Sequence, residues 1–184
     1  MWTLAWVCCR CCFADTFFGV RLAHRLDYGT CGIITVCKSR LAHARLARQF
    51  CEHSIVKKYV CLSVSENSNR VCLNSSGACG FVCFSVFWFS FLRLSLLDCR
   101  LVVGKRHLIR LTQRHLCGDR LYCVNVRLFG LLACLINSLR HQCLGAYLIC
   151  LRHFVGSKLL VMESAPKLFR WILINFLKPS APGL

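Results

Sequence analysis

The fold of this chain is decided near its start, by the stretch Leu22-Ala23-His24-Arg25-Leu26-Asp27-Tyr28-Gly29-Thr30-Cys31-Gly32-Ile33-Ile34. Its end opens an apolar run, residues 33–36, whose β-branched side chains are typical of a strand. Two glycines and a threonine ahead of that run indicate a polar turn. Asp27 precedes the turn, and a carboxylate in this setting is either a turn residue with a surface ion pair or a nucleophile or base. Alone, so short a motif favours the turn residue.

The next two elements follow from local patterns. Ser39 is a suitable N-cap for a helix that runs to Phe50. An apolar stripe at helical spacing predicts the face of this helix that packs on the sheet: Leu41, Ala44, Leu46, Ala47 and Phe50. Residues 54–63 are rich in β-branched side chains and predict a strand.

The charge of the chain points to a polyanionic partner. The 184 residues include 24 Lys and Arg against 7 Asp and Glu, a formal net charge of +17. Such a field favours nucleic acid or an anionic membrane surface. The basic residues are scattered along the chain, which favours a folded RNA-binding face over a disordered tail. A merely basic protein is the alternative that charge leaves open.

Cysteine usage and hydropathy indicate an intracellular protein. The 17 cysteines are odd in number and show no repeated spacing, so we expect reduced thiols that act as small apolar residues. The cluster Cys8, Cys9, Cys11 and Cys12 has no paired partner cluster downstream, and we expect no metal site. The apolar run 81–92 is shorter than the roughly 20 residues that span a bilayer, which favours a buried strand or hairpin over a membrane hairpin.

Three segments together resemble one family. His24-Arg25-Leu26-Asp27, with the Thr-x-Gly turn and strand behind it, resembles the catalytic motif of the RluA-type RNA pseudouridine synthases. Lys57-Lys58-Tyr59 stands where that family has a Lys-x-Tyr strand. His107-Leu108-Ile109-Arg110 resembles its His-Gln-Ile-Arg segment, with leucine in place of glutamine. Residues 140–148 and 156–166 resemble its late strand and closing hairpin more weakly.

The resemblance implies an α+β fold: a mixed, mainly antiparallel sheet with flanking helices. We expect a catalytic domain over residues 21–176, with an unmatched insert at about 65–93, an unassigned segment 1–20 and a tail 177–184. A last helix is expected at 169–176. The strand and Lys-Pro turn that usually precede the aspartate motif in this family are not found, so we expect a domain shortened at its N-terminus.

The resemblance also implies the roles of the site residues. Asp27 would be the catalytic residue, Tyr59 would lie against the uracil ring, and Arg110 would pair with Asp27. Asp119 would order a turn. RNA-binding roles are implied for His24, Arg25, Lys57, Lys105, Arg106 and His107.

The expected activity is the isomerisation of uridine in rRNA or tRNA to pseudouridine, without a cofactor. We expect a monomer in the cytoplasm or mitochondrion, without stable membrane insertion. Two alternatives stay open: a degenerate homologue that binds RNA without catalysis, and a small basic membrane-associated protein.

Overall fold

The computed structural model describes residues 21–64, 70–73, 79–89, 94–105, 107–112, 116–122, 142–153 and 158–164. Within these ranges, the side chains of residues 70–73, 79, 81 and 85–89 are not described. The N-terminal cysteine cluster, Arg106, the helix expected at 169–176 and the C-terminal tail lie outside the described residues.

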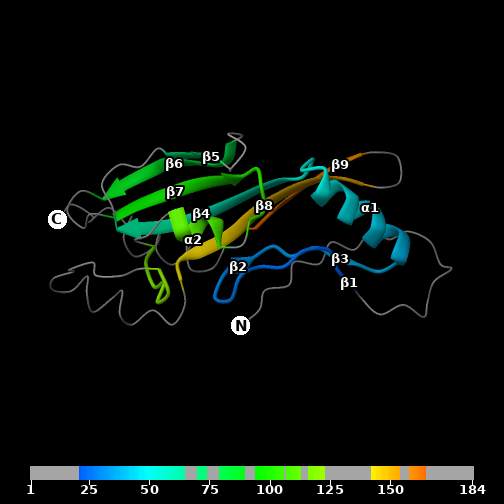
Figure 1. Ribbon diagram of the computed structural model, residues 1–184, viewed down its shortest axis with the longest axis horizontal. Coiled ribbons are helices and arrows are strands. Elements are labelled where there is room, and N and C mark those ends of the chain that lie inside the picture. Colours follow the sequence, from blue (N-terminus) through cyan, green and yellow to red (C-terminus); the bar gives the residue numbers. More distant parts are fainter. Residues whose placement is uncertain are drawn as a thin grey trace, which may run out of the picture.

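A seven-stranded sheet forms the body of the molecule, with strand order β2-β8-β4-β7-β6-β5 and β9 paired to β8 (Figure 1). Its strands are β2 (Cys31–Gly32), β4 (Val56–Val64), β5 (Arg70–Leu73), β6 (Cys79–Phe89), β7 (Leu94–Leu101), β8 (Leu144–Arg152) and β9 (Leu159–Glu163). The β2–β8 pair is parallel, whereas β4, β5, β6, β7, β8 and β9 pair antiparallel with one another. The expected α+β fold with a mixed, mainly antiparallel sheet is therefore confirmed.

The continuous strand predicted over residues 33–36 is wrong, because residues 33–35 lie between two short strands. β2 ends at Gly32, and β3 (Val36–Cys37) pairs with β1 (Arg21–Leu22) in a separate two-stranded sheet. Gly32 has a φ of +127°, and a Cβ there would lie 2.0 Å from the carbonyl oxygen of Ala146. The close approach to β8 forces a glycine and a change of direction, which a residue pattern for one continuous strand does not predict.

Helix α1 (Arg40–Cys51) begins as predicted, since the hydroxyl of Ser39 accepts a hydrogen bond from the Ala42 amide at 3.1 Å. The predicted buried face is partly wrong. Ala42 and Leu46 are buried, whereas Leu41 is 56% exposed and Ala44 is also exposed. The helix packs through the side that carries Ala42 and Leu46, and not through Leu41 and Ala44. Hydrophobicity alone could not place that contact.

The core consists of two apolar clusters. One lies around β4, β7 and β6 and includes Cys61, Cys83 and Cys99, which are 0% exposed and carry free thiols. The other packs α1 against β8 through Leu46, Ile149 and other apolar residues. The phenylalanine-rich run enters the sheet as β6, so the strand is as predicted, although Phe84 on it is 53% exposed. Among the helices described, none is long and apolar enough to cross a membrane.

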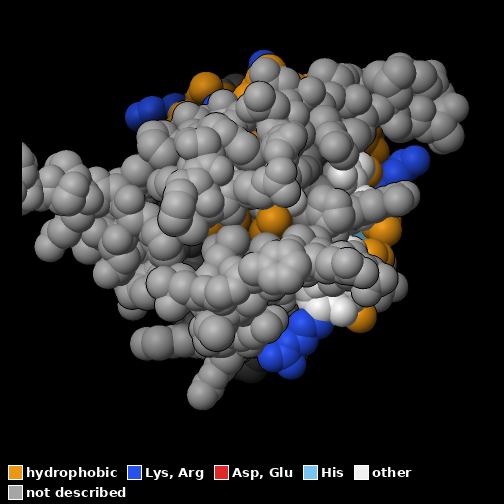
Figure 2. Space-filling view, turned by 90° about the vertical axis from the view of Figure 1, so that its left-hand side faces the viewer, with side chains coloured by type: hydrophobic (Ala, Val, Ile, Leu, Met, Phe, Trp, Pro, Cys, Tyr) orange, Lys and Arg blue, Asp and Glu red, His pale blue; other side chains and the backbone are white. Residues whose placement is uncertain are grey.

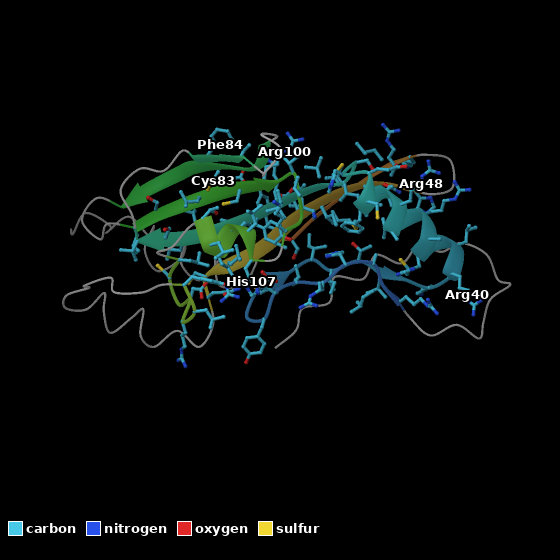
Figure 3. All side chains as sticks on the ribbon, in the orientation of Figure 1. Arg40, Arg48, Cys83, Phe84, Arg100 and His107 are labelled. Atoms are coloured by element: carbon cyan, nitrogen blue, oxygen red, sulfur yellow. The ribbon has the colours of Figure 1, made fainter. Side chains whose placement is uncertain are left out.

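Basic side chains are distributed over the surface. On the face shown in Figure 2, Lys and Arg side chains lie at several separate places. Figure 3 shows Arg40 and Arg48 pointing outward from α1, and Phe84 and Arg100 on the opposite side of the sheet from His107. The basic residues that are scattered in the sequence therefore also lie apart from one another on the described part of this surface.

Candidate active site

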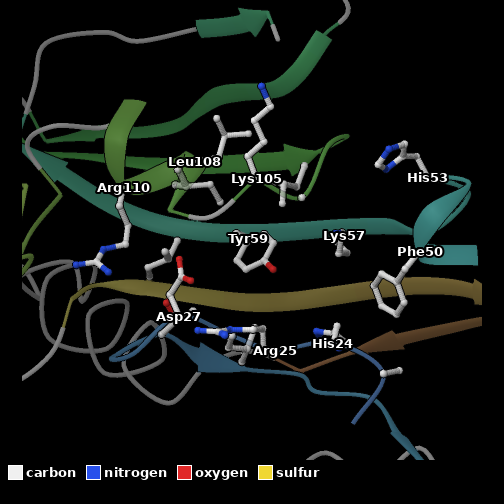
Figure 4. Close-up of a pocket in the computed structure, with 17 residues that line it drawn as sticks. His24, Arg25, Asp27, Phe50, His53, Lys57, Tyr59, Lys105, Leu108 and Arg110 are labelled. Atoms are coloured by element: carbon white, nitrogen blue, oxygen red, sulfur yellow. The ribbon is translucent and has the colours of Figure 1, made fainter. Parts of the chain in front are cut away.

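A cavity of about 440 Å³ lies between the main sheet and the segment that leads into β2. A volume of this size is typical of sites that hold one small molecule or one residue of a polymer. In Figure 4, Asp27, Arg25 and His24 come from that segment and lie across the cavity from Tyr59 and Lys57 on β4. The remaining lining residues are Ala23, Leu26, Thr30, Phe50, His53, Leu101, Gly104, Lys105, Leu108, Ile109, Arg110 and Leu144.

The turn after Asp27 is tied firmly to the sheet. The Thr30 amide donates to the Asp27 carbonyl at 3.0 Å, and Gly29 has a φ of +81°. The side chain of Thr30 is buried and accepts a 2.6 Å hydrogen bond from the Gln142 amide group. These bonds hold the Asp27 backbone beside β8, so the carboxylate enters the cavity from a rigid support.

His24 lines the cavity, but one of its ring nitrogens is already engaged. Its Nε2 accepts a 3.0 Å hydrogen bond from the Thr35 amide, and its ring lies 5.1 Å from that of Phe50. Burial lowers the pKa of His24 to about 4, and the positive charge of Lys57 adds to the effect. His24 is therefore a neutral residue that links its own strand region to Thr35, and it contributes no positive charge to RNA binding.

Tyr59 and Lys57 alternate with Lys58 along β4, so both face the cavity. Burial, together with the negative charge of Asp27, raises the pKa of Tyr59 to about 12. Burial also lowers the pKa of Lys57, whose Nζ lies 5.4 Å from the centroid of the Phe50 ring. Tyr59 is therefore a neutral phenol at pH 7, suited to packing against a flat ring.

The expected ion pair between Arg110 and Asp27 is not formed. The Nε and Nη2 groups of Arg110 instead donate to the two carboxylate oxygens of Asp119, each at 2.7 Å. Hydrogen bonds to Asp119 raise the pKa of Arg110. Burial alone would raise the pKa of Asp119, but hydrogen bonds from Arg110 and from the Leu121 amide outweigh it and lower the pKa. Arg110 lines the cavity near Asp27 without touching its carboxylate.

Asp119 orders a turn, as predicted. One of its oxygens accepts from the backbone amides of Leu121 and Tyr122 at 3.0 and 3.3 Å. The turn itself is joined to β4 by the Cys117 amide, which donates to the Leu62 carbonyl at 2.9 Å. Backbone hydrogen bonds thus hold Asp119 in place. Its carboxylate pairs with Arg110, which was expected to pair with Asp27.

The described side chain that reaches the Asp27 carboxylate is His107. Its Nε2 lies 3.6 Å from Oδ1 of Asp27, and its Nδ1 lies 2.8 Å from the hydroxyl of Tyr122. Sequence reasoning placed His107 among RNA-binding residues and assigned no role to Tyr122. The spacing Gly118-Asp119-x-x-Tyr122 was the signal that could have drawn attention to the tyrosine.

Two further predicted RNA-binding residues, Arg25 and Lys105, lie at the rim of the cavity. Arg25 and Lys105 line it and are exposed to solvent, where phosphate groups would have access. Arg106 lies outside the described residues. Among the described side chains, no group of three or more acidic, histidine or cysteine residues is arranged to bind a metal ion.

Comparisons with known proteins show which proteins this sequence resembles. The profile of the RNA pseudouridylate synthase family matches residues 14–79. The chain is 42% identical over 53 residues to RNA pseudouridine synthase 2, chloroplastic, of Oryza sativa, and covers 12% of that protein. It is 29% identical over 122 residues to Ribosomal large subunit pseudouridine synthase D of Zymomonas mobilis, and covers 38% of it.

Solved structures support the same fold. Human RNA Pseudouridylate Synthase Domain Containing 1 superposes with a TM-score of 0.61 at 17% identity, covering 80% of this chain and 69% of the human chain. Human RNA Pseudouridylate Synthase Domain Containing 4 superposes with a TM-score of 0.62 at 16% identity, covering 84% of this chain and 75% of the human chain. The matched segment 14–79 carries Asp27 and Tyr59, and the fold is shared. Residues 14–79 are thus similar in sequence to the RNA pseudouridylate synthase family, and the chain shares its fold with the two human proteins.

Proposed function

We propose that this chain isomerises uridine in RNA to pseudouridine, with Asp27 as the catalytic residue. The observation that carries the proposal is that Asp27 and the neutral ring of Tyr59 line the same cavity. Both residues belong to the segment that matches the family profile. The chain spans only 12 to 38% of the curated relatives named above, so the activity of the whole protein is part of this proposal.

The reaction asks for little besides positioning and one carboxylate. The bond between C1′ and N1 of uridine breaks, the uracil turns, and a bond forms between C1′ and C5. The hydrogen on C5 is lost to solvent, and N1 gains a proton. The Asp27 carboxylate would attack the sugar or the base, or remove a sugar proton, and the geometry is compatible with each route.

The other cavity residues would bind and hold the uridine. The target nucleotide must leave its helix or loop, as with other enzymes that act on a base. The ring of Tyr59 would stack on the uracil, and Arg25, which is exposed, would fill the gap left in the RNA. Lys57 and Lys105 would contact phosphates, together with Arg106.

The substrate class and setting belong to the same proposal. The name of the Zymomonas mobilis relative refers to the large ribosomal subunit, which supports rRNA as a substrate, with tRNA as the alternative. We further propose a monomer that works in the cytoplasm or mitochondrion. The rice relative is named as chloroplastic, which adds an organelle to the compartments to be tested.

One observation favours a second function, RNA binding without catalysis. Nε and Nη2 of Arg110 donate to Asp119, and Asp27 lacks the ion pair with this arginine that the family resemblance implies. A pocket that binds a flipped uridine but fails to orient its carboxylate would hold RNA and release it unchanged.

Tritium release separates the two functions. RNA labelled with tritium at C5 of uridine loses the label to water only when C5 exchanges its hydrogen for the bond to C1′. We expect release with the wild-type chain and none above background with Asp27→Asn, while both bind the RNA equally in a filter assay. Equal release from both would reject Asp27 as the catalytic residue. Binding without release by the wild type would establish the second function.

A further inference from the structure

We infer that His107 is the positioning residue of Asp27, and that Tyr122 selects the ring nitrogen that His107 presents to the carboxylate. The inference rests on the proposed function, because Asp27 must be catalytic for its positioning to affect the rate. It assigns to His107 a role different from the RNA contact that the family resemblance implies.

His107 and Asp27 lie beside each other next to the cavity, which Asp27 lines. Their side chains are 17% and 23% exposed, and Nε2 lies 3.6 Å from Oδ1. This separation is too long for a hydrogen bond, so the contact is electrostatic. Because both groups are largely removed from water, a nitrogen-bound proton at Nε2 would attract the carboxylate more strongly than at an exposed site.

Tyr122 favours the neutral tautomer of His107 that carries its proton on Nε2. A phenol can donate to Nδ1 of a neutral imidazole, and it lies 2.8 Å away. When it donates, the ring proton must sit on Nε2, facing Asp27. The other neutral tautomer would turn the Nε2 lone pair toward the carboxylate, and this arrangement is repulsive. The two neighbours of His107 therefore favour the same tautomer.

The Arg110–Asp119 pair holds Tyr122 in place. The guanidinium carbon of Arg110 lies 5.1 Å from the centroid of the Tyr122 ring. The Tyr122 amide donates to Asp119 at 3.3 Å. Arg110 therefore acts on Asp27 indirectly, through Tyr122 and His107. The Arg110–Asp119 ion pair supports the site by holding Tyr122 against His107.

The backbone of His107 supports a role for its ring. Its φ of +56° lies in the left-handed region, which is uncommon for a residue with a side chain. The residue stands directly before helix α2 (Leu108–Thr112), and its carbonyl accepts from the Leu111 amide at 2.9 Å. Glycine or asparagine would adopt this φ more easily. Residues held in such conformations often cluster at functional sites.

Single-turnover kinetics test the positioning role. We expect His107→Ala to lower the rate constant of tritium release by about 100-fold, as for other misplaced catalytic groups. His107→Gln, whose amide N–H can reach the place of Nε2–H, should recover a large part of the rate. RNA affinity should change by less than about twofold in both variants. The matched control is His43→Gln on α1, away from the cavity, which should release tritium at the wild-type rate.

Three results would overturn the inference: wild-type rates for His107→Ala, a loss confined to RNA affinity, or no recovery with His107→Gln in a chain that folds normally. The first would show that Asp27 needs no support from His107. The second would restore the role of RNA contact, and the third would show that the N–H group is not what matters.

A measurement that needs no activity decides the tautomer. In the ¹⁵N-labelled chain, the His107 ring should show a protonated Nε2 and an unprotonated, hydrogen-bonded Nδ1. Tyr122→Phe should remove the hydrogen bond at Nδ1, shift its ¹⁵N resonance and raise the population of the Nδ1–H tautomer. A dominant Nδ1–H tautomer, or spectra unchanged by Tyr122→Phe, would overturn the inference. An inactive wild type would overturn the proposed function instead, and these spectra would still accept or reject the arrangement of His107.

Discussion

Arg110 and Asp119 form a bidentate ion pair in the interior, with both N–O distances at 2.7 Å and side chains that are 5% and 0% exposed. The pair lies next to the cavity that holds Asp27, and Arg110 lines that cavity. Because the two residues are only nine positions apart, the pair also closes the turn that carries Tyr122. Its contributions to stability and to the site can be separated by mutation.

Asp119→Ala should destabilise the fold strongly. The substitution leaves the guanidinium of Arg110 buried without its partner, a change that costs about 3–5 kcal/mol in proteins. Urea denaturation would measure the loss. The matched control is Glu52→Ala, which breaks the exposed Arg48–Glu52 pair on α1 and should alter stability little. Equal effects of the two substitutions would contradict the structural importance of the buried pair.

His24 should make stability fall as the medium becomes acidic. The pKa of His24 is lowered to about 4 in the fold from an ordinary value of 6.5, so the unfolded chain binds its proton first. Lowering the pH from about 6.5 to 4 therefore favours unfolding, by up to about 3 kcal/mol from this group. Urea midpoints between pH 7 and 4.5 should show this slope in the wild type and a shallower one in His24→Asn. Parallel slopes would reject the assignment to His24.

Gly32→Ala should disrupt the junction of β2 and β8. The added Cβ would lie 2.0 Å from the Ala146 carbonyl oxygen, at a φ of +127° that alanine adopts only under strain. We expect a loss of at least about 2 kcal/mol and a displaced Asp27. Gly104→Ala is the comparison, because its Cβ would meet only the flexible end of Lys57 at 3.2 Å. Thermal unfolding of both variants would show the contrast, and a similar small shift in both would count against it.

Tyr59 should act through its ring and not through ionisation. Its pKa of about 12 keeps the phenol neutral at pH 7. Under the proposed function, Tyr59→Phe keeps stacking on the uracil and should retain kcat/KM within a few-fold. Tyr59→Leu should lose about 1–3 kcal/mol of that interaction, a 10- to 100-fold fall. Should Tyr59→Phe be as impaired as Tyr59→Leu, the hydroxyl would be the important group.

Salt dependence should reveal the phosphate contacts at the rim of the cavity. Arg25 and Lys105 are exposed there, where neutralising a phosphate releases counterions. For single-stranded RNA, Arg25→Gln or Lys105→Gln should each reduce the slope of log Kd against log salt by about 0.7. Arg40→Gln, at the outer end of α1, should leave the slope unchanged. A slope reduced equally by all three would indicate attraction by net charge alone.

Local chemistry made several parts of this molecule predictable. Ser39 caps α1 because a side-chain oxygen can satisfy an orphan amide three residues ahead. β-branched residues lead Tyr59 into a strand, and alternation places it on the same face as Lys57. The resemblance to RluA-type enzymes supplied the order of Asp27, Tyr59 and Arg110, and all three line one cavity.

The packing face of α1 and the charge pairs of the site were not predictable in this way. The buried face of α1 was misjudged at Leu41, because the angle at which a helix meets its sheet depends on every neighbour at once. Arg110 pairs with Asp119 because a turn bonded to β4 fixes that carboxylate within reach. The contact of His107 with Asp27 needs the Gly32 approach to β8 and the α2 start to be in place together.

By itself, therefore, the sequence determined helix α1, strand β4, the likeness to a family and several residues of the cavity, because hydrogen-bond capping, side-chain alternation and a matched motif act over a few neighbouring positions. Only the tertiary structure decided which charges meet. An ion pair forms where backbone bonds have already fixed its two ends, and for Asp27 that placed His107 at the carboxylate and Arg110 one step behind it.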